Sequence, residues 1–320
     1  MKAAVYNKGG PPDVFRYIDV GDPTPKPTEI LIRNEAISIE GGDLTNRAYA
    51  PATERDHIVG YQSAGEVLWV GSEAGDFAVG DKVAVTGTHG SHAELRAVTG
   101  RTAWKVPAGL DMQVAATIPI PFGTADNCLI HYGQLKAGDT AFIQSGAGGV
   151  GVAAIQIAKR AGARVIATAS SDERLAALYP LGLDHGINSS TADVVAEVMR
   201  ITEGKGCDVT LDGNGGRSLQ QCVAVLGWKG RATFIGVTAR EDMTIDVRSL
   251  MAGNRALMGL GLGLEMGTSR VRRMVGEYMT AIAAGDYQVQ IDRSFPLAQA
   301  AEAHALIESR QAVGRVLLIP

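Results

Sequence analysis

The chain has 320 residues, 46% of them hydrophobic and 20% charged, and its 30 basic and 34 acidic side chains leave a net charge of −4. This near-balance offers no basic surface for nucleic acid, and no apolar run approaches the roughly 20 residues of a membrane-spanning helix. The N-terminal residues resemble a strand rather than a secretory signal, and the length exceeds that of one ordinary core, so we expect a two-domain cytoplasmic protein without nucleic-acid or membrane partners.

Short alternating segments dominate the first hundred or so residues. Examples are residues 29–34 and 64–70, which are separated from their neighbours by Gly, Pro and Asp turns. Alternation of this period is typical of half-buried strands, so the segment predicts a β-rich domain.

After about Leu110 the pattern changes to apolar strands that are each followed by an amphipathic helix. The expected strands are 140–144, 164–168, 208–211 and 231–235, and the expected helices are 150–161, 172–181 and 218–226. This repeated unit favours a doubly wound parallel sheet of the Rossmann type.

The C-terminal part is expected to rejoin the β-rich domain. A long helix over 271–284 is followed by Phe295-Pro296-Leu297, another helix and a last strand over 314–319. The predicted fold class is therefore α/β, with a β-rich domain of residues 1–120 completed by 265–320, and a parallel-sheet domain of residues 121–264. The apolar segment 256–262 follows the last strands of that sheet and would expose an edge, which predicts a homodimer.

The cysteines give no sign of disulfide or metal chemistry. Cys128, Cys207 and Cys222 are odd in number, widely spaced and set in apolar or helix-like surroundings. Neither a disulfide framework nor a Cys-x-x-Cys site can be built from them, so we expect buried thiols.

A glycine-rich turn lies between the first strand and first helix of the parallel-sheet region. Gly146-Ala147-Gly148-Gly149-Val150-Gly151 reads G-x-G-x-x-G. In this context the glycines allow a tight turn and a close approach of backbone to a diphosphate, which the unsatisfied N–H groups of the helix N-terminus bind. The turn predicts a dinucleotide cofactor.

The end of the second strand indicates which dinucleotide. Binding of NAD usually uses an Asp or Glu there, whereas this strand ends on Ser170-Ser171 and Arg174 follows one turn into the next helix. Small hydroxyls leave room for a 2′-phosphate and a guanidinium attracts it, so NADPH is favoured over NADH. Asp172 and Glu173 are interpreted as first-turn residues of a helix capped by Ser170 or Ser171.

Taken together, several strings resemble one superfamily along the whole chain. They are MKAAVYNKGGPPDVF, HIVGYQSAGEVLWVG, VGDKVAV, SHAELRAV, GTADNCLI, AGGVG, DVTLDGNGG and AVGRVLLIP. The chain resembles the medium-chain dehydrogenase/reductase superfamily and looks most like its zinc-independent quinone oxidoreductase branch. The resemblance implies a GroES-like substrate domain beside a Rossmann NADP(H)-binding domain.

The positions that hold catalytic zinc in the alcohol dehydrogenases of this superfamily are changed here. Glu40 stands where the first Cys precedes an Asp, Tyr61-Gln62 replaces the His-Glu pair, and Ile120 stands at the third ligand position. The four-cysteine structural lobe is also missing. A catalytic zinc needs three protein ligands, so we expect a metal-free protein.

The resemblance also assigns cofactor positions one by one. It places Thr124 at the nicotinamide end, and it places Asn188 where relatives often have a tyrosine near the phosphate. Asn214 and Gly236 follow the fourth and fifth strands, and Arg315 matches a basic residue near the cofactor. The expected cofactor-binding set is Thr124, Ser145, Gly148, Gly149, Val150, Ser170, Arg174, Asn188, Asn214, Gly236 and Arg315.

The implied chemistry is hydride transfer from NADPH to an acceptor that is already electron-poor, such as a quinone or an α,β-unsaturated carbonyl. Negative charge that develops on the acceptor needs a hydrogen-bond donor or a proton source. The candidates are Tyr49, Tyr61 and Glu40, although Glu40 could equally pair with a basic residue.

The sequence leaves three functions open. The first is an NADPH:quinone oxidoreductase, and the second is a 2-alkenal or enone double-bond reductase acting on a small-molecule substrate. The third is a low-turnover NADPH-binding protein with a sensor or structural role. Products formed from a quinone and from an enone distinguish the first two, and background turnover despite tight cofactor binding identifies the third.

Overall fold

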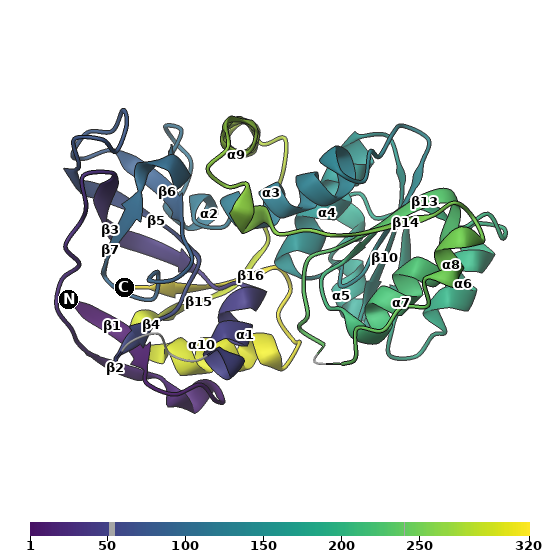
Figure 1. Cartoon of the computed structure of the whole chain (residues 1–320), viewed down its shortest axis with the longest axis horizontal. Helices are drawn as coiled ribbons and strands as arrows, with labels where there is room; N and C mark the ends of the chain where they lie inside the picture. Colours follow the sequence, from purple (N-terminus) through teal and green to yellow (C-terminus); the bar gives the residue numbers. More distant parts are fainter. Residues whose placement is uncertain (51–54, 240) are drawn as a thin grey trace. The chain divides into compact units, whose positions relative to one another are not determined.

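The computed structural model describes residues 1–50, 55–239 and 241–320, which form two compact units (Figure 1). Unit 1 comprises residues Met1–Ile120 and Gly263–Pro320, and unit 2 comprises Pro121–Leu262. The unit boundaries lie beside those expected from the sequence, at residues 120/121 and 264/265.

The described part of unit 2 contains a parallel sheet with the strand order β11-β10-β9-β12-β13-β14. Its strands are β9 (Thr140–Ile143), β10 (Arg164–Ala169), β11 (His185–Asn188), β12 (Cys207–Asp212), β13 (Leu226–Phe234) and β14 (Ala256–Gly259). The central strands β9, β10 and β12 are almost entirely buried because both faces of the sheet are covered. This is the doubly wound parallel sheet that the alternating pattern predicted, so the expected α/β class is confirmed.

Helices cover both faces of this sheet (Figure 1). They are α3 (Pro119–Asp126), η3 (Asn127–His131), α4 (Gly149–Arg160), α5 (Asp172–Ala176), η4 (Tyr179–Leu181), α6 (Val194–Ile201), α7 (Gly216–Ala224) and α8 (Arg248–Met251). On one face Val198 of α6 and Cys222 of α7 pack with Phe142 and Ile166 in a buried cluster. The buried sides of α6 and α7 therefore face the sheet.

The helix expected over 172–181 is shorter than its pattern suggested. The α-helix ends at Ala176, and residues Tyr179–Leu181 form a separate 3₁₀ turn that contains Pro180. Proline has no N–H to donate and its ring clashes with the preceding turn, so the helix cannot continue through this position.

Unit 1 is the β-rich part. Its strands are β1 (Lys2–Tyr6), β2 (Arg16–Asp19), β3 (Glu29–Ser38), β4 (His57–Ile58), β5 (Gln62–Val70), β6 (Lys82–Thr86), β7 (Leu95–Thr99), β8 (Ala103–Lys105), β15 (Ile291–Pro296) and β16 (Arg315–Ile319). Its helices are η1 (Pro12–Val14), α1 (Gly41–Tyr49), η2 (Gly100–Thr102), α2 (Met112–Ala115), η5 (Leu262–Leu264, which begins in unit 2), α9 (Ser269–Ala283), η6 (Leu297–Gln299) and α10 (Ala300–Glu308).

The last strand rejoins the N-terminal sheet, as the sequence predicted. β16 lies between β15 and β3, with Leu317 opposite Ser38 and Leu318 opposite Ile37. Ile37 and Leu318 belong to a buried core that also contains Ala303 of α10. Unit 1 is therefore built from both ends of the described chain.

The thiols and the helix lengths bear on two further expectations. Cys128, Cys207 and Cys222 are buried free thiols, as predicted, and burial raises the pKa of Cys128 to about 12. In the described ranges, no helix has the length and apolar character that a membrane crossing requires.

Candidate cofactor and catalytic site

The sheet of unit 2 gathers most of the predicted cofactor residues at one edge. Ser145, Ser170, Asn214 and Gly236 come shortly after the ends of β9, β10, β12 and β13, and Asn188 is the last residue of β11. Because these strands are parallel, all five positions lie along the carboxyl edge of the sheet, where doubly wound folds bind their ligands.

The glycine-rich turn between β9 and α4 is tightly packed. Ser145 has a φ of 56°, and a Cβ on Gly151 would lie 2.4 Å from the Ser145 carbonyl oxygen. Gly148 is the N-cap of α4, and it provides no side chain to satisfy the N–H groups of the first turn, which Gly149 and Val150 begin. An uncapped helix N-terminus beside a glycine turn fits the diphosphate of a dinucleotide.

Two further strand ends are joined to this turn. The Asn214 side chain donates a hydrogen bond to the Ser145 hydroxyl, with 2.6 Å between Nδ2 and Oγ. A Cβ on Gly236 would lie 2.1 Å from the Gly213 carbonyl oxygen, so only glycine allows the chain after β13 to approach β12 so closely. Ser145, Asn214 and Gly236 thus form one continuous rim.

Ser170 and Arg174 lie together at the end of β10. Arg174 donates from Nη1 to the Ser170 hydroxyl at 2.8 Å, and Ser171 is the N-cap of α5. Asp172 therefore belongs to the first helical turn, and its carboxylate accepts a hydrogen bond from Asn188 Nδ2 at 3.0 Å. The guanidinium of Arg174 lies at the strand end where an NAD site usually places a carboxylate.

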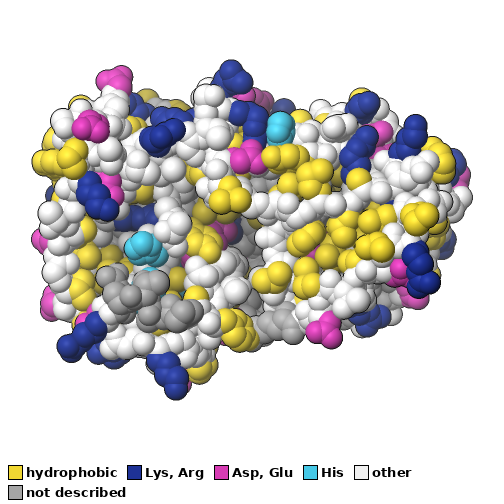
Figure 2. Space-filling view, in the orientation of Figure 1, with side chains coloured by type: hydrophobic (Ala, Val, Ile, Leu, Met, Phe, Trp, Pro, Cys, Tyr) yellow, Lys and Arg dark blue, Asp and Glu magenta, His cyan; other side chains and the backbone are white. Residues whose placement is uncertain are grey.

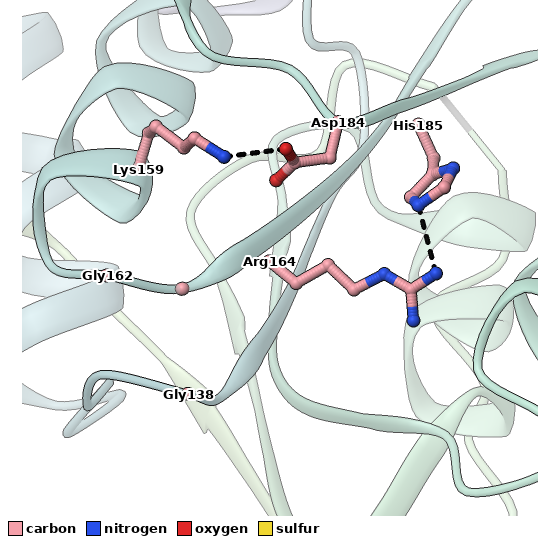
Figure 3. A pocket seen from close by; sticks show the side chains of 7 residues that line it. Gly138, Lys159, Gly162, Arg164, Asp184 and His185 are labelled. Carbon is pink, nitrogen blue, oxygen red and sulfur yellow. Dashed lines mark hydrogen bonds and ion pairs between the residues drawn. The ribbon is translucent and has the colours of Figure 1, made fainter.

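A shallow pocket of about 370 Å³ is found at the opposite edge of this sheet (Figure 3). Its lining includes an ion pair of 2.6 Å between Lys159 and Asp184, and a contact of 2.9 Å between Arg164 Nη2 and His185 Nε2. Arg164 and His185 are the first residues of β10 and β11, so this pocket lies away from the carboxyl edge. None of the sequence-predicted residues lines it.

Two other predicted residues lie on helices. Thr124 is buried in α3 of unit 2, and Tyr49 is the last residue of α1 in unit 1, with 59% of its surface exposed.

Glu40 and Arg315, predicted for different roles, form a buried ion pair in unit 1. Arg315 Nη2 donates to Glu40 Oε1 and also to the Ser38 hydroxyl at 2.6 Å. Glu40 Oε1 accepts a second bond from Gln62 Nε2 at 2.5 Å. Burial raises the pKa of Glu40, and the adjacent guanidinium opposes that rise. The alternative that Glu40 pairs with a basic residue is the arrangement found here.

The ion pair bears on metal binding at the positions that hold catalytic zinc in the alcohol dehydrogenases of this superfamily. Glu40 is the carboxylate among them, and it accepts hydrogen bonds from the Arg315 guanidinium and the Gln62 side-chain amide. The side-chain oxygen of Gln62, Oε1, accepts from the Ile120 N–H at 3.0 Å. A guanidinium already supplies the positive charge that a metal would bring. The donor set therefore does not fit zinc.

A second carboxyl lies beneath the start of α1. Asp43 is fully buried, and its Oδ2 accepts from the Glu40 N–H at 2.8 Å, which fixes the beginning of the helix. Burial raises the pKa of Asp43 to about 8 because the interior penalises the charged form. Asp43 is therefore mostly neutral at pH 7.

Tyr61 is held against the first turns of α1. Its hydroxyl oxygen accepts a hydrogen bond from Asn46 Nδ2 at 2.9 Å. A Cβ on Gly42 would lie 2.2 Å from Cε2 of the tyrosine ring, so the ring rests directly on that glycine. Burial raises the pKa of Tyr61, and the hydrogen bond from Asn46 opposes the rise.

Asp43, Asn46 and Gln62 were not predicted as site residues. Asp43 and Asn46 follow Glu40 at intervals of three along α1, so the helical period brings them to one face. That spacing was readable in the sequence. Gln62 comes from β5, so its approach to Glu40 depends on tertiary packing; the signal that could have found it is its match, like that of Glu40, to a position that holds zinc in the alcohol dehydrogenases.

Comparisons with known proteins agree with this architecture. Residues 149–278 match the zinc-binding dehydrogenase family model, and residues 26–108 match the alcohol dehydrogenase GroES-like domain. A quinone oxidoreductase of Pseudomonas aeruginosa is 31% identical over 315 residues, which cover 97% of each chain. A 2-haloacrylate reductase of Burkholderia sp. is 30% identical over 341 residues, covering 100% of this chain and 99% of that protein.

Solved structures give the same relationship. The crystal structure of Escherichia coli quinone oxidoreductase complexed with NADPH has a TM-score of 0.94 at 26% identity, with 100% of both chains covered. The chain belongs to the medium-chain dehydrogenase/reductase superfamily, in its quinone oxidoreductase-like branch. The resemblance inferred from the sequence is confirmed.

Proposed function

We propose that the protein is an NADPH-dependent oxidoreductase that transfers hydride to a quinone or a similar electron-poor small molecule. The observation that carries this proposal is the carboxyl edge of the unit 2 sheet, which carries both the glycine turn with the uncapped N-terminus of α4 and the pair of Ser170 and Arg174. The similarity to quinone oxidoreductases, one of them complexed with NADPH, supports it. We also retain the cytoplasm as the proposed location.

The residues at this carboxyl edge have distinct roles in the proposal. The N–H groups of Gly149 and Val150 would hold the diphosphate, and Arg174 with Ser170 would hold the 2′-phosphate. When bound, NADPH supplies a hydride and thus both electrons of the reduction. We keep Thr124, Ser145, Asn188, Asn214 and Gly236 as proposed cofactor residues.

The ion pair refines the roles of Glu40 and Arg315. Each is engaged by the other inside unit 1, so we propose that they organise the start of α1 and β16 and leave proton donation to a tyrosine. We propose Tyr61 for this role because the hydrogen bond from Asn46 fixes its hydroxyl, and we keep Tyr49 as the other candidate.

A double-bond reductase is the second candidate. The 2-haloacrylate reductase relative has a name that describes reduction of an activated alkene, and its similarity extends over the whole chain. Hydride delivered to carbon must be followed by protonation of the neighbouring carbon, whereas a quinone is protonated on oxygen.

Turnover with a panel of acceptors tests both candidates. We expect the purified protein to oxidise NADPH in the presence of quinones and to yield the corresponding hydroquinones. Saturated products from enones or haloacrylates, with quinones inactive, would instead favour the alkene reductase. Tight NADPH binding with background oxidation across the panel would contradict both enzymatic functions and favour a sensor.

We further propose a homodimer formed along β14. This strand pairs with β13 on one side, and no described strand pairs with its other side. Figure 2 shows hydrophobic side chains gathered on the visible face of unit 2, and Val247, Met251 and Trp228 of that unit are each at least 67% exposed. An unpaired edge with apolar neighbours favours pairing with a second copy.

Light scattering tests this assembly. We expect the mass of a dimer at micromolar concentration, and a lysine in place of Met258 on β14 should shift the population towards monomer. A monomeric wild-type mass at micromolar concentration would contradict the proposal.

A further inference from the structure

The Tyr61 phenol has a fixed position within unit 1. Its main-chain carbonyl accepts hydrogen bonds from the Gly87 N–H at 2.8 Å and from Arg96 Nη2 at 3.0 Å. Its ring rests on Gly42 of α1, and its hydroxyl reaches Asn46 one turn further along the same helix. The backbone, the ring and the oxygen of Tyr61 are therefore each held by a separate contact.

The direction of the bond to Asn46 determines what the hydroxyl can still do. A tyrosine hydroxyl has one donor hydrogen and can also accept, whereas the Asn46 Nδ2 group can only donate. Because Asn46 donates, the hydrogen of Tyr61 is not used in this contact. In the described part of the chain, no side chain or carbonyl accepts that hydrogen.

We propose that Asn46 positions Tyr61 as the proton donor of the reaction, holding its oxygen while leaving its hydrogen for the substrate. This inference rests on the proposed function, which it deepens. After hydride has been delivered, the substrate carries a negative charge on oxygen or on the adjacent carbon. The O–H bond of Tyr61 breaks as the new O–H or C–H bond forms, and the tyrosinate then regains a proton from water.

Asn46 also stabilises the state that follows proton donation. A tyrosinate oxygen accepts a stronger, charge-assisted hydrogen bond than a neutral phenol does. The same contact that orients the hydroxyl therefore favours loss of its proton. Asn46 acts through Tyr61, so we call it a positioning residue.

The charged and titratable groups around Tyr61 act in the opposite direction. Asp43 of α1, once ionised above its pKa of about 8, and Glu40, the N-cap of that helix, disfavour the tyrosinate through their negative charge, and the Tyr6 phenol of β1 lies near the Asp43 carboxyl. Arg96 of β7 contacts Tyr61 at the main-chain carbonyl, and its guanidinium also donates to the Ser63 hydroxyl and to the carbonyls of Gly60 and His89. Asn46 is thus the neighbour that lowers the pKa of this phenol, which stays protonated near neutral pH.

The test replaces Asn46 with leucine in the full chain. Tyrosine labelled at Cζ reports the pKa of Tyr61 by NMR, and the spectrum of Tyr61→Phe assigns the signal. We expect the pKa of Tyr61 to rise by about 1 and kcat for NADPH oxidation to fall about tenfold, with KM little changed. The alkaline limb of the kcat profile should move to higher pH by a similar amount.

Three control variants separate the positioning effect of Asn46 on Tyr61 from a general effect on the folding of α1. Thr45→Ala removes a hydroxyl that bonds to the Gly41 carbonyl on the same helix, and it should leave both readouts unchanged. Asn46→Gln should restore part of the lost rate because it keeps the donor. Asp43→Asn removes the carboxyl with a pKa of about 8, so an alkaline limb that persists in this variant belongs to Tyr61.

Gly42→Ala provides an independent variant. The new methyl group would overlap the Tyr61 ring, so the ring must move away from Asn46. We expect the same rise in the pKa of Tyr61, although alanine is a better helix former than glycine.

The outcomes distinguish this inference from the proposed function. An unchanged pKa of Tyr61 in Asn46→Leu, or an unchanged kcat in Tyr61→Phe with normal wild-type turnover, would overturn the inference alone. Absence of NADPH oxidation by the wild type would overturn the proposed function, and with it the proton transfer. The NMR titration would still report on the Asn46 contact because it needs no substrate.

Discussion

Replacing Arg315 with methionine is expected to lower the free energy of unfolding of unit 1 by about 3–5 kcal/mol. Glu40 would be left in the interior without the guanidinium that now bonds to its carboxylate. Denaturant unfolding followed by fluorescence measures the loss. Trp104 is buried in unit 1 and serves as the probe once Trp69 and Trp228 have been replaced by phenylalanine.

A double variant provides the control for this prediction. Glu40→Gln combined with Arg315→Met removes the stranded charge, so it should recover part of the lost stability. The cofactor-binding role that the sequence suggested for Arg315 predicts a different result. If Arg315→Met weakened NADPH binding and left the unfolding free energy within 1 kcal/mol of the wild type, Arg315 would act as a cofactor residue and the ion pair would be unimportant.

Replacing Arg174 with alanine is expected to weaken NADPH binding by about 10- to 100-fold and to leave NADH binding nearly unchanged. The two cofactors differ by the 2′-phosphate, and the guanidinium of Arg174 is held at the end of β10 by the Ser170 hydroxyl. Titration calorimetry with both cofactors measures the two affinities.

A carboxylate at position 170 should change the cofactor preference more than the loss of Arg174 does. Ser170→Asp would repel the 2′-phosphate and pair with Arg174, so the preference should reverse towards NADH. Arg200→Ala is the control, because it removes the same charge from an exposed ion pair on α6. Equal affinities for NADPH and NADH in the wild type would contradict this account of the site.

Periodicity predicted the fold well wherever local sequence decides the structure. The strand expected over 164–168 is β10, and the helix expected over 150–161 is α4, because strand and helix periods both persist over several residues there. The one clear overextension was the helix after Ser171, where the apolar pattern continued beyond Pro180. A steric rule outweighed the pattern at that position.

The candidate site was predictable only in part. The glycine turn and Ser170 with Arg174 are contiguous in sequence, so a local motif contained them. The pair of Glu40 and Arg315 joins positions separated by most of the chain, and it forms because β16 enters the sheet beside β3. A pattern along the sequence identifies each residue but does not show that the two charges neutralise one another.

The separation of unit 1 into two stretches of chain has a consequence for biosynthesis. Unit 2 is one continuous segment, so all of its strands are available before the second stretch of unit 1 has been translated. In unit 1, β3 can pair with β5 and β7 earlier, but the sheet is complete only when residues Arg315–Ile319 lie between β3 and β15. Until they leave the ribosome, Glu40 has no counter-charge, and the nascent N-terminal β segment stays incomplete and exposed to chaperones.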